Sequence, residues 1–308
     1  MSEDGLKDFD RSLRAIISVV AFFDMFEYPL TAYEIWENLD KSIELEKIYK
    51  ILEPVTNNFI FSDGQNNNAY RLIIQQKNGF YFLNGRAEIV VTRQKRYNYF
   101  CRKVKIARRF TYLFSFFPFV RVVALANIIG AYNLHDGSDI DFFIITEPRR
   151  IWLSRLYCTG LAKILNSRPN IRTKKDKICL SFYLTQDYSN LTNLRLSGED
   201  PYFDYWRRGL VLLYNKNKSY EHFLNNNSAA IDLKTIYPVV KKNCLDWLER
   251  QAKAWQLKIM PPILKAAINN SAGVVVNDQV LKFYQHDRRR EYAQKYGNKI
   301  HEIFKENY

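Results

Sequence analysis

Hydrophobic and polar positions alternate with a helical period at the start of the chain. Apolar residues recur every three to four positions over 12–26, and Pro29 ends the pattern. Thr31 and Glu34 have the spacing of a capping box, which predicts a second helix through position 39. A third amphipathic stretch covers 42–52. The pattern therefore predicts three consecutive helices before position 57.

The helical period then gives way to two short apolar runs. Residues 71–76 and 80–83 flank Lys77-Asn78-Gly79, and Asn-Gly between two such runs is a strong hairpin signal. Three helices followed by a hairpin resemble a winged-helix module. This resemblance implies docking on nucleic acid through the third helix and the hairpin wing.

The charges of the predicted third helix and of the segment 93–109 show how well each would bind nucleic acid. The predicted third helix carries Lys47 and Lys50 but also Glu44 and Glu46, so docking on nucleic acid and contact with a protein both stay open. Residues 93–109 hold eight Lys or Arg residues and no acid, with aromatic residues between them. This segment is predicted to be a long helix that is either a solvated face or a surface that follows phosphates.

The central part of the chain contains two apolar runs, 122–125 and 142–145, around a polar turn. Their β-branched and aromatic composition predicts two buried strands. Asp139 and Asp141 are two positions apart at the start of the second strand, so their side chains are expected to emerge on the same face. Adjacent carboxylates repel each other unless a cation lies between them, and oxygen ligands suit Mg²⁺. The alternative is a polar turn whose aspartates bond their own backbone.

Beyond this turn, Pro148 introduces a predicted helix over 149–165, and 178–184 is predicted to be a strand. From position 191 onward the pattern predicts helices. The last of these is expected to be capped by Asn277 and to turn four residues towards the core: Val280, Leu281, Phe283 and Tyr284.

These elements predict an α+β fold with a small mixed sheet. The expected domains are a winged-helix-like module, a basic linker helix, a small mixed-sheet core and a C-terminal helical region, over 1–92, 93–117, 118–190 and 191–308.

The composition and net charge of the chain limit the classes of partner that it is expected to bind. The chain has 308 residues, is 47% hydrophobic and carries a net charge of +14, which favours packed cores and attraction to polyanions. Its four cysteines are far apart, which predicts buried thiols in a reducing compartment. The polar N-terminus lacks a signal sequence, and the most apolar window, 110–130, is interrupted by Pro118 and Arg121. We therefore expect a cytoplasmic protein with no membrane partner.

The order strand, small-residue turn, Ser-Asp-hydrophobic-Asp and strand resembles the polymerase-beta-type nucleotidyltransferase superfamily. The layout also resembles bacterial proteins with a winged helix ahead of such a domain, through FYFLNGR and VLKFYQHDRRREY. The resemblance implies that Asp139 and Asp141 hold Mg²⁺, which binds an NTP and activates an acceptor hydroxyl. It also implies that Asn127 and Ser138 position phosphate.

The chain departs from the pattern of this superfamily at two places. The family has Gly-Ser about ten residues before the first aspartate, where this chain has Asn127-Ile128. The family also places a third carboxylate on a later core strand, where this chain offers Ser181 or Cys179. The nearest acids, each a candidate base alongside water, lie just beyond the two ends of that strand: Asp176 and Asp187.

Two functions follow from these observations. The first is an enzyme that moves an NMP group from an NTP to a hydroxyl acceptor, with Mg²⁺ held by Asp139 and Asp141. The second is a catalytically degenerate protein of the same fold that acts as a winged-helix nucleic-acid-binding regulator or adaptor, with the surface 93–109 as its contact region.

Overall fold

The computed structural model describes residues 3–39, 43–56, 73–126, 133–170, 172–188, 190–196, 198, 200–227, 244–268, 270 and 272–305. These residues form two compact units. Unit 1 comprises 1–98, 129–133 and 291–308, and unit 2 comprises 99–128 and 134–290. Each unit is described by itself below.

Unit 1 begins with three helices, as the sequence predicted: α1 (Glu3–Asp24), α2 (Ala32–Asn38) and α3 (Leu45–Thr56). The capping box of α2 is confirmed, because the Thr31 hydroxyl accepts from the Glu34 amide at 3.2 Å and the Thr31 amide donates to the Glu34 carboxylate at 2.8 Å. These two bonds satisfy amides that the first turn of the helix leaves unpaired. The predicted second helix therefore begins where its cap requires.

The predicted hairpin is also confirmed. Strands β1 (Ile74–Lys77) and β2 (Phe80–Leu83) pair antiparallel. The two turn residues, Asn78 and Gly79, have φ angles of 53° and 80°. Positive φ at both central positions is what a tight hairpin turn requires, which explains the Asn-Gly sequence.

Two long helices contribute residues to both units. Helix α5 (Glu88–Ser115) covers most of the predicted basic helix 93–117, and its residues pass from unit 1 to unit 2 after Asn98. Helix α11 (Arg289–Lys305) passes from unit 2 to unit 1 after Arg290. No helix in the described part of the chain is long and apolar enough to cross a membrane.

The core of unit 2 is a six-stranded mixed sheet with the order β6-β3-β4-β5-β8-β7. Strands β4 and β5 are parallel, and the other neighbours are antiparallel. The strands are β3 (Val120–Leu125), β4 (Ile140–Thr146), β5 (Ile178–Thr185), β6 (Val211–Asn215), β7 (Val274–Val276) and β8 (Val280–Phe283). The predicted strands at 122–125, 142–145 and 178–184 are confirmed.

The prediction of an all-helical region after position 191 is wrong, because β6, β7 and β8 are strands of this sheet. The Asn277 side chain does not cap a helix. It accepts hydrogen bonds from the Gln279 and Val280 amides and so forms the turn between β7 and β8. A short apolar run fits both a helix and a strand, and here pairing of β8 with β5 decides between them.

The helices of unit 2 lie around this sheet: α6 (Ile151–Ile164), α7 (Pro201–Arg208), α8 (Ser219–Asn226), α9 (Leu245–Lys258) and α10 (Pro262–Ala267). Short 3₁₀ turns cover Gln186–Tyr188 and Thr192–Leu194. Helix α6 starts two residues later than predicted, because Arg149 has a φ of 63° that a helix does not accommodate.

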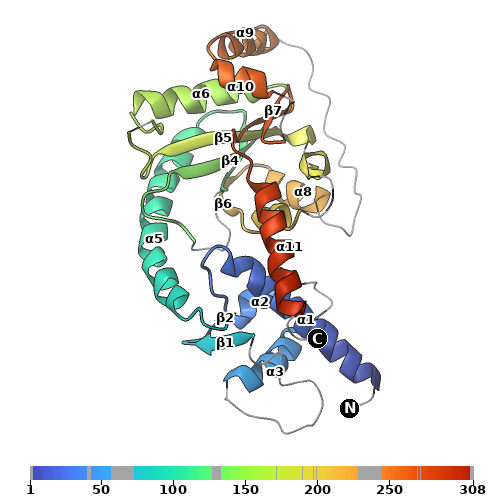
Figure 1. Ribbon diagram of the computed structural model, residues 1–308. Helices are drawn as coiled ribbons and strands as arrows, with labels where there is room; N and C mark the ends of the chain where they lie inside the picture. Colours follow the sequence, from blue (N-terminus) through green and yellow to red (C-terminus); the bar gives the residue numbers. More distant parts are fainter. Residues whose placement is uncertain are drawn as a thin grey trace. The chain divides into compact units, whose positions relative to one another are not determined.

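Each face of the sheet has its own apolar layer. Helices α5 and α6 lie beside the strands of the sheet (Figure 1). On one face, Phe114 of α5 and Trp152 of α6 pack with Phe142 and other strand residues. On the other, Phe143 of β4 contacts Trp206 of α7 and Phe223 of α8, with ring centroids 5.8 and 5.2 Å apart. The central strands β4 and β5 are thus buried on both sides, which fixes the position of residues at their ends.

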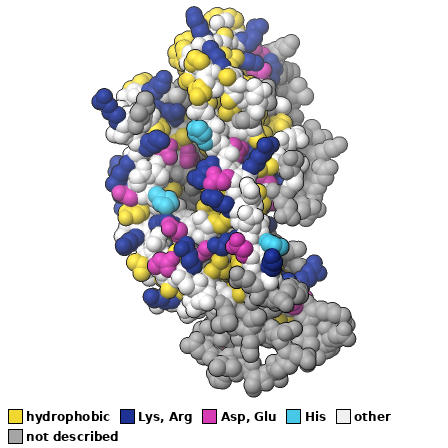
Figure 2. Space-filling model, in the orientation of Figure 1, with side chains coloured by type: hydrophobic (Ala, Val, Ile, Leu, Met, Phe, Trp, Pro, Cys, Tyr) yellow, Lys and Arg dark blue, Asp and Glu magenta, His cyan; other side chains and the backbone are white. Residues whose placement is uncertain are grey.

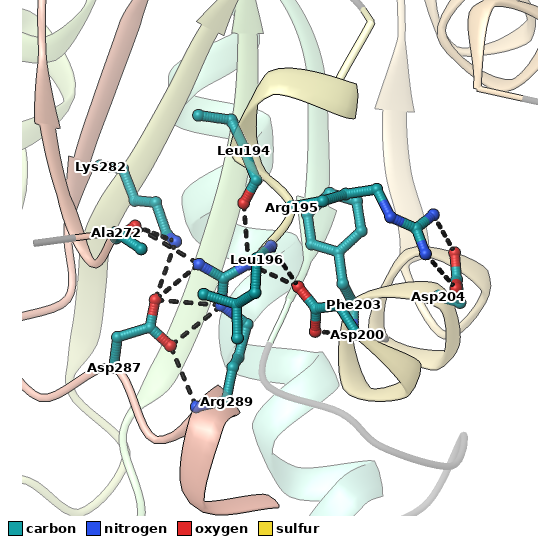
Figure 3. A network of polar contacts seen from close by, with 10 residues as sticks. All are labelled: Leu194, Arg195, Leu196, Asp200, Phe203, Asp204, Ala272, Lys282, Asp287 and Arg289. Carbon is teal, nitrogen blue, oxygen red and sulfur yellow. Dashed lines mark hydrogen bonds and ion pairs between the residues drawn. The ribbon is translucent and has the colours of Figure 1, made fainter. Parts of the chain in front are cut away.

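A buried ion network joins the end of β8 to α7 (Figure 3). Arg289 donates to the Asp200 carboxylate at 3.0 Å and to the Asp287 carboxylate at 2.7 Å, and it also donates to the Leu194 carbonyl. Lys282 is paired with Asp287 at 3.4 Å. Two cations therefore balance two carboxylates, and Arg289, the second of three consecutive arginines at 288–290, is a buried structural residue.

Candidate metal centre

The two predicted aspartates lie at the beginning of β4, beside the beginning of β5. In the parallel register Ile140 pairs with Ile178 and Asp141 pairs with Cys179. Asp139, Asp141 and Cys179 each offer one ligand atom, and these three atoms all lie within 4.8 Å of one another. All three residues are half-buried. The structure therefore brings the predicted pair together and adds a thiol at the strand position where a third carboxylate was sought.

Burial and mutual repulsion disfavour charge at this centre. Burial, followed by the negative charge of Asp139, raises the pKa of Asp141 to about 7. Burial and the Asp141 carboxylate also raise the pKa of the Cys179 thiol well above its usual range. Cys179 therefore stays a protonated thiol at neutral pH, and its sulfur lies 2.8 Å from the Ser181 hydroxyl. Within the described residues, Asp141 forms no ion pair with a lysine or arginine.

Tyr284, which the sequence pattern predicted to face the core from a helix, is a neighbour of the centre and follows a strand instead. It follows β8, and burial together with the nearby Asp141 and Cys179 raises the pKa of its hydroxyl well above the usual value. Its amide donates to the Gly273 carbonyl at 2.8 Å. Gly273 is required there, because a Cβ atom would lie 2.1 Å from the Tyr284 carbonyl oxygen. Only the pairing of β8 with β5 brings this tyrosine near the aspartates, which no local pattern could have indicated.

The loop before Asp139 is held by a lysine from α5. Lys103 is fully buried, and its ammonium donates to the Ser138 carbonyl and, at 2.9 Å, to the Asp176 carboxylate. The Asp176 amide donates to the same Ser138 carbonyl at 3.1 Å. The Ser138 hydroxyl donates to the His135 carbonyl at 3.0 Å. Ser138, predicted to position phosphate, therefore uses its side chain in the turn that presents Asp139.

A second pair of carboxylates, Asp136 and Asp176, lies around the turn before Asp139 and is neutralised by cations. Asp136 pairs with Lys175 at 2.7 Å and with Arg102 at 2.6 Å. Arg102 also pairs with Asp176 at 2.9 Å. Hydrogen bonds from Lys175 and then Arg102 hold the pKa of Asp136 below its usual value. This group is a structural ion network around the turn.

Asp176 and Asp187, the two candidate bases, have surroundings that differ from those of Asp139 and Asp141. Although partial burial raises it, Lys103 and Arg102 hold the pKa of Asp176 below its ordinary value, so this carboxylate is a weak base. Asp187 lies in the 3₁₀ turn after β5, at the opposite end of the strand from Cys179. The six residue-to-residue steps from position 179 to position 185 span about 20 Å, which separates Asp187 from the aspartates. Asn127 and Ile128 lie outside the described residues.

The predicted basic surface on α5 is only partly a surface. Of the eight cations in 93–109, four are at most half-exposed and form ion pairs: Arg93, Arg96, Arg102 and Lys103. Arg93 is an example, because it is buried, donates to Glu34 at 2.7 Å and lies 4.2 Å from the Tyr28 ring centroid. The other four cations are exposed: Lys95, Lys105, Arg108 and Arg109.

The cations of α3 are also paired. Lys47 bonds the Asp8 carboxylate at 2.5 Å, and Lys50 bonds Glu46 at 2.7 Å. Neither lysine is therefore an unpaired cation for phosphate, which weakens the case for nucleic-acid docking through this helix.

The four cysteines differ in exposure. Cys158 is buried and Cys179 half-buried, whereas Cys101 and Cys244 are exposed, and all four are free. The prediction that all four are buried is wrong for the last two, because sequence spacing says nothing about which face of a helix or turn meets solvent.

Compared with protein-family models, with curated proteins and with solved structures, the chain has no match in any of the three. The chemistry of the centre therefore carries the functional argument. Two carboxylates and one neutral thiol converge at the entry to two buried strands, and such a donor set can hold a divalent cation.

Proposed function

We propose that the chain is a metal-dependent nucleotidyltransferase that moves an NMP group from an NTP to a hydroxyl acceptor. The observation that carries this proposal is the convergence of Asp139 and Asp141, whose ligand atoms lie within 4.8 Å of each other and of Cys179. Burial raises the pKa of Asp141, so the metal-free arrangement is costly once both groups are charged. A divalent cation between them removes that cost.

The donor set fits Mg²⁺ at the two carboxylates. Mg²⁺ takes oxygen ligands and is usually bound through one or two carboxylates together with waters and substrate phosphates. Asp139 and Asp141 meet that requirement. The neutral thiol of Cys179 is a poor ligand for this hard cation, so the remaining coordination positions fall to water and phosphate oxygens.

The proposed division of labour follows from this fit. When bound, the ion offsets the charge on the transferring phosphate group during in-line displacement. Asp139 and Asp141 hold the ion, and the turn fixed by Lys103 orients Asp139. Arg168, whose positive charge acts on Asp141, donates to the Ile178 carbonyl and supplies a cation near the phosphate path. Because Asp176 is ion-paired and Asp187 is at the far end of β5, water is the remaining candidate acceptor for the hydroxyl proton.

In this proposal α1 to α3 and the β1–β2 hairpin form a winged-helix-like module that contacts a protein rather than nucleic acid. The pairing of Lys47 with Asp8 and of Lys50 with Glu46 supports that choice, because both α3 cations are already neutralised.

The test is calorimetric titration of each NTP with Mg²⁺ into the wild-type chain and Asp141→Asn. We expect metal-dependent binding in the wild type and its loss in the variant. Asp136→Asn is the matched control, because Asp136 lies in the neighbouring ion network and binding should persist there. Absence of binding of every NTP to the wild type would refute the proposal.

Turnover provides the second readout. Asp139→Ala is expected to abolish transfer while the circular dichroism spectrum stays unchanged, because Asp139 precedes β4 rather than pairing within it. Unchanged transfer by this variant would remove Asp139 from the catalytic machinery.

A further inference from the structure

The outer side of α9 and α10 exposes large apolar residues. Figure 2 shows hydrophobic side chains gathered among Lys and Arg at the top of the view, over these two helices. Trp247, Leu248 and Trp255 are 58%, 43% and 51% exposed, and Ile259 and Ile263 are 50% and 65% exposed. We call these five residues the α9–α10 face. Two tryptophans and three branched aliphatic residues so exposed on one short segment are unusual for a surface that meets only water.

The inner side of α9 explains why these residues cannot reach the core. Ala252 and Gln256 are buried, and the Gln256 side-chain amide donates to the Trp152 carbonyl of α6 at 2.8 Å. Positions 248, 255 and 259 follow one another by seven and four residues and so form one stripe, which runs beside buried Ala252 along the edge of the packed side. Packing on α6 therefore fixes the orientation that leaves the α9–α10 face outward.

Charge on this segment is also divided between the two sides. Residues 244–268 contain two acids, and both are engaged with α6. Asp246 bonds Arg150 at 2.8 Å, and the Glu249 carboxylate accepts from the Trp152 and Leu153 amides at 2.8 and 2.9 Å. The exposed ionic groups of the segment are all cations: Arg250, Lys258 and Lys265.

We infer that the α9–α10 face docks on the surface of an anionic phospholipid bilayer. Trp and branched aliphatic side chains enter the boundary between headgroups and acyl chains, where tryptophan is enriched. Lys and Arg around them bind the anionic headgroups while their methylene stems follow the apolar surface. The outward charge of this face, positive without an exposed acid in 244–268, is the complement that such a surface requires.

A partner protein and a second copy of this chain fit the α9–α10 face less well than a lipid surface. Lysine is depleted from protein–protein interfaces, whereas two of the three exposed cations here are lysines. A two-fold contact with a second copy would bring this net positive face against itself. The lipid surface is therefore the occupant that the observations favour.

This docking differs from the expectation of no membrane partner, which considered only spanning segments. Helix α9 has 14 residues, too few to cross a bilayer, so it would lie in the plane of the interface. The inference is independent of the proposed transferase activity, because none of its residues belongs to the metal centre.

The test uses the full chain and sedimentation with vesicles of phosphatidylcholine alone or mixed with phosphatidylserine. We expect binding at least about tenfold tighter to the anionic vesicles, weakened by salt. Trp255→Ser with Ile259→Ser should reduce that binding at least about tenfold, because both side chains lose their apolar burial. A second variant, Lys258→Glu with Lys265→Glu, should reduce binding to anionic vesicles alone.

The matched control is Tyr112→Ser with Phe116→Ser, which removes two exposed aromatic residues in the same unit, one in the last turn of α5 and one directly after it. Binding of this control should stay within about twofold of the wild type, because these residues lie outside the proposed face. The inference would be overturned if the Trp255 and Ile259 variant and the Tyr112 and Phe116 control lost vesicle binding equally. It would also be overturned if the wild type did not bind anionic vesicles. Binding to polyglutamate but not to vesicles, lost in the Trp255 and Ile259 variant, would assign the face to an acidic protein and equally overturn it.

Discussion

Two pairs of carboxylates lie near the beginnings of the adjacent strands β4 and β5 but have opposite surroundings. Asp136 and Asp176 are surrounded by Arg102, Lys103 and Lys175, and their pKa values lie below the usual range. The pKa of Asp141, next to Asp139, is instead raised by burial and by like charge.

The difference separates an architectural ion network from a centre where burial and a neighbouring carboxylate disfavour the charged form of Asp141. A charge-balanced group keeps its loop in place and requires nothing further. A half-buried carboxylate beside another, with no ion pair of its own among the described residues, is stable in its charged form when a cation is supplied. The same short segment, Asp136 to Asp141, thus serves both structure and the proposed chemistry.

The largest expected effect comes from removing Lys103, the buried cation that pairs with Asp176. Lys103→Met leaves Asp176 without its ammonium and removes one of the two donors to the Ser138 carbonyl, and we expect a loss of about 3 kcal/mol in the free energy of unfolding. Denaturant titration measures it. Lys175→Met is the matched control, because this lysine is exposed and its removal should change stability little. A Lys103 variant as stable as the control would show that the network does not hold the turn.

The second prediction concerns the pH dependence of the metal-free protein. The pKa of Asp141 is about 7 in the folded chain and about 3.9 in the unfolded chain, so folding favours the protonated form. The free energy of unfolding should therefore fall by a few kcal/mol as pH rises from about 4 to about 7. Asp141→Asn should remove this slope, and saturating Mg²⁺ should reduce it in the wild type.

The stability contributed by Asp136 and Asp176 should depend on pH in the opposite way. Because their pKa values are lowered on folding, Asp136 and Asp176 contribute stability that is present at neutral pH. That contribution should disappear only as pH falls below the ordinary pKa of aspartate, about 3.9. Thermal unfolding across this range separates the two windows, and a single common window would contradict the distinction between the pairs.

The smallest expected effect comes from replacing the thiol. Cys179→Asp adds a third carboxylate opposite Asp141, and we expect Mg²⁺ affinity to rise about tenfold. Cys179→Ser, which is neutral and close in size, should leave Mg²⁺ affinity nearly unchanged. Titration of the metal alone by calorimetry gives both values. Equal affinities for the two variants would place position 179 outside the coordination sphere.

Strong local signals were sufficient for several elements. The capping box at Thr31, the Asn78-Gly79 turn and the apolar runs of β3 to β5 each predicted a structure that is present. The short runs of β7 and β8 were misassigned to a helix, because three or four apolar residues carry too little periodicity to choose. Pairing with β5, about 100 residues earlier in the chain, supplies what the local pattern lacks.

The sequence by itself determined that Asp139 and Asp141 lie side by side, because side chains two positions apart on a strand share a face. Only the tertiary structure decided what surrounds them. Parallel pairing of β4 with β5 sets Cys179 opposite Asp141, and the packing of α5 brings Lys103 to Asp176, 73 positions away. These contacts depend on sheet register and helix packing, which are set by the whole core rather than by neighbouring residues.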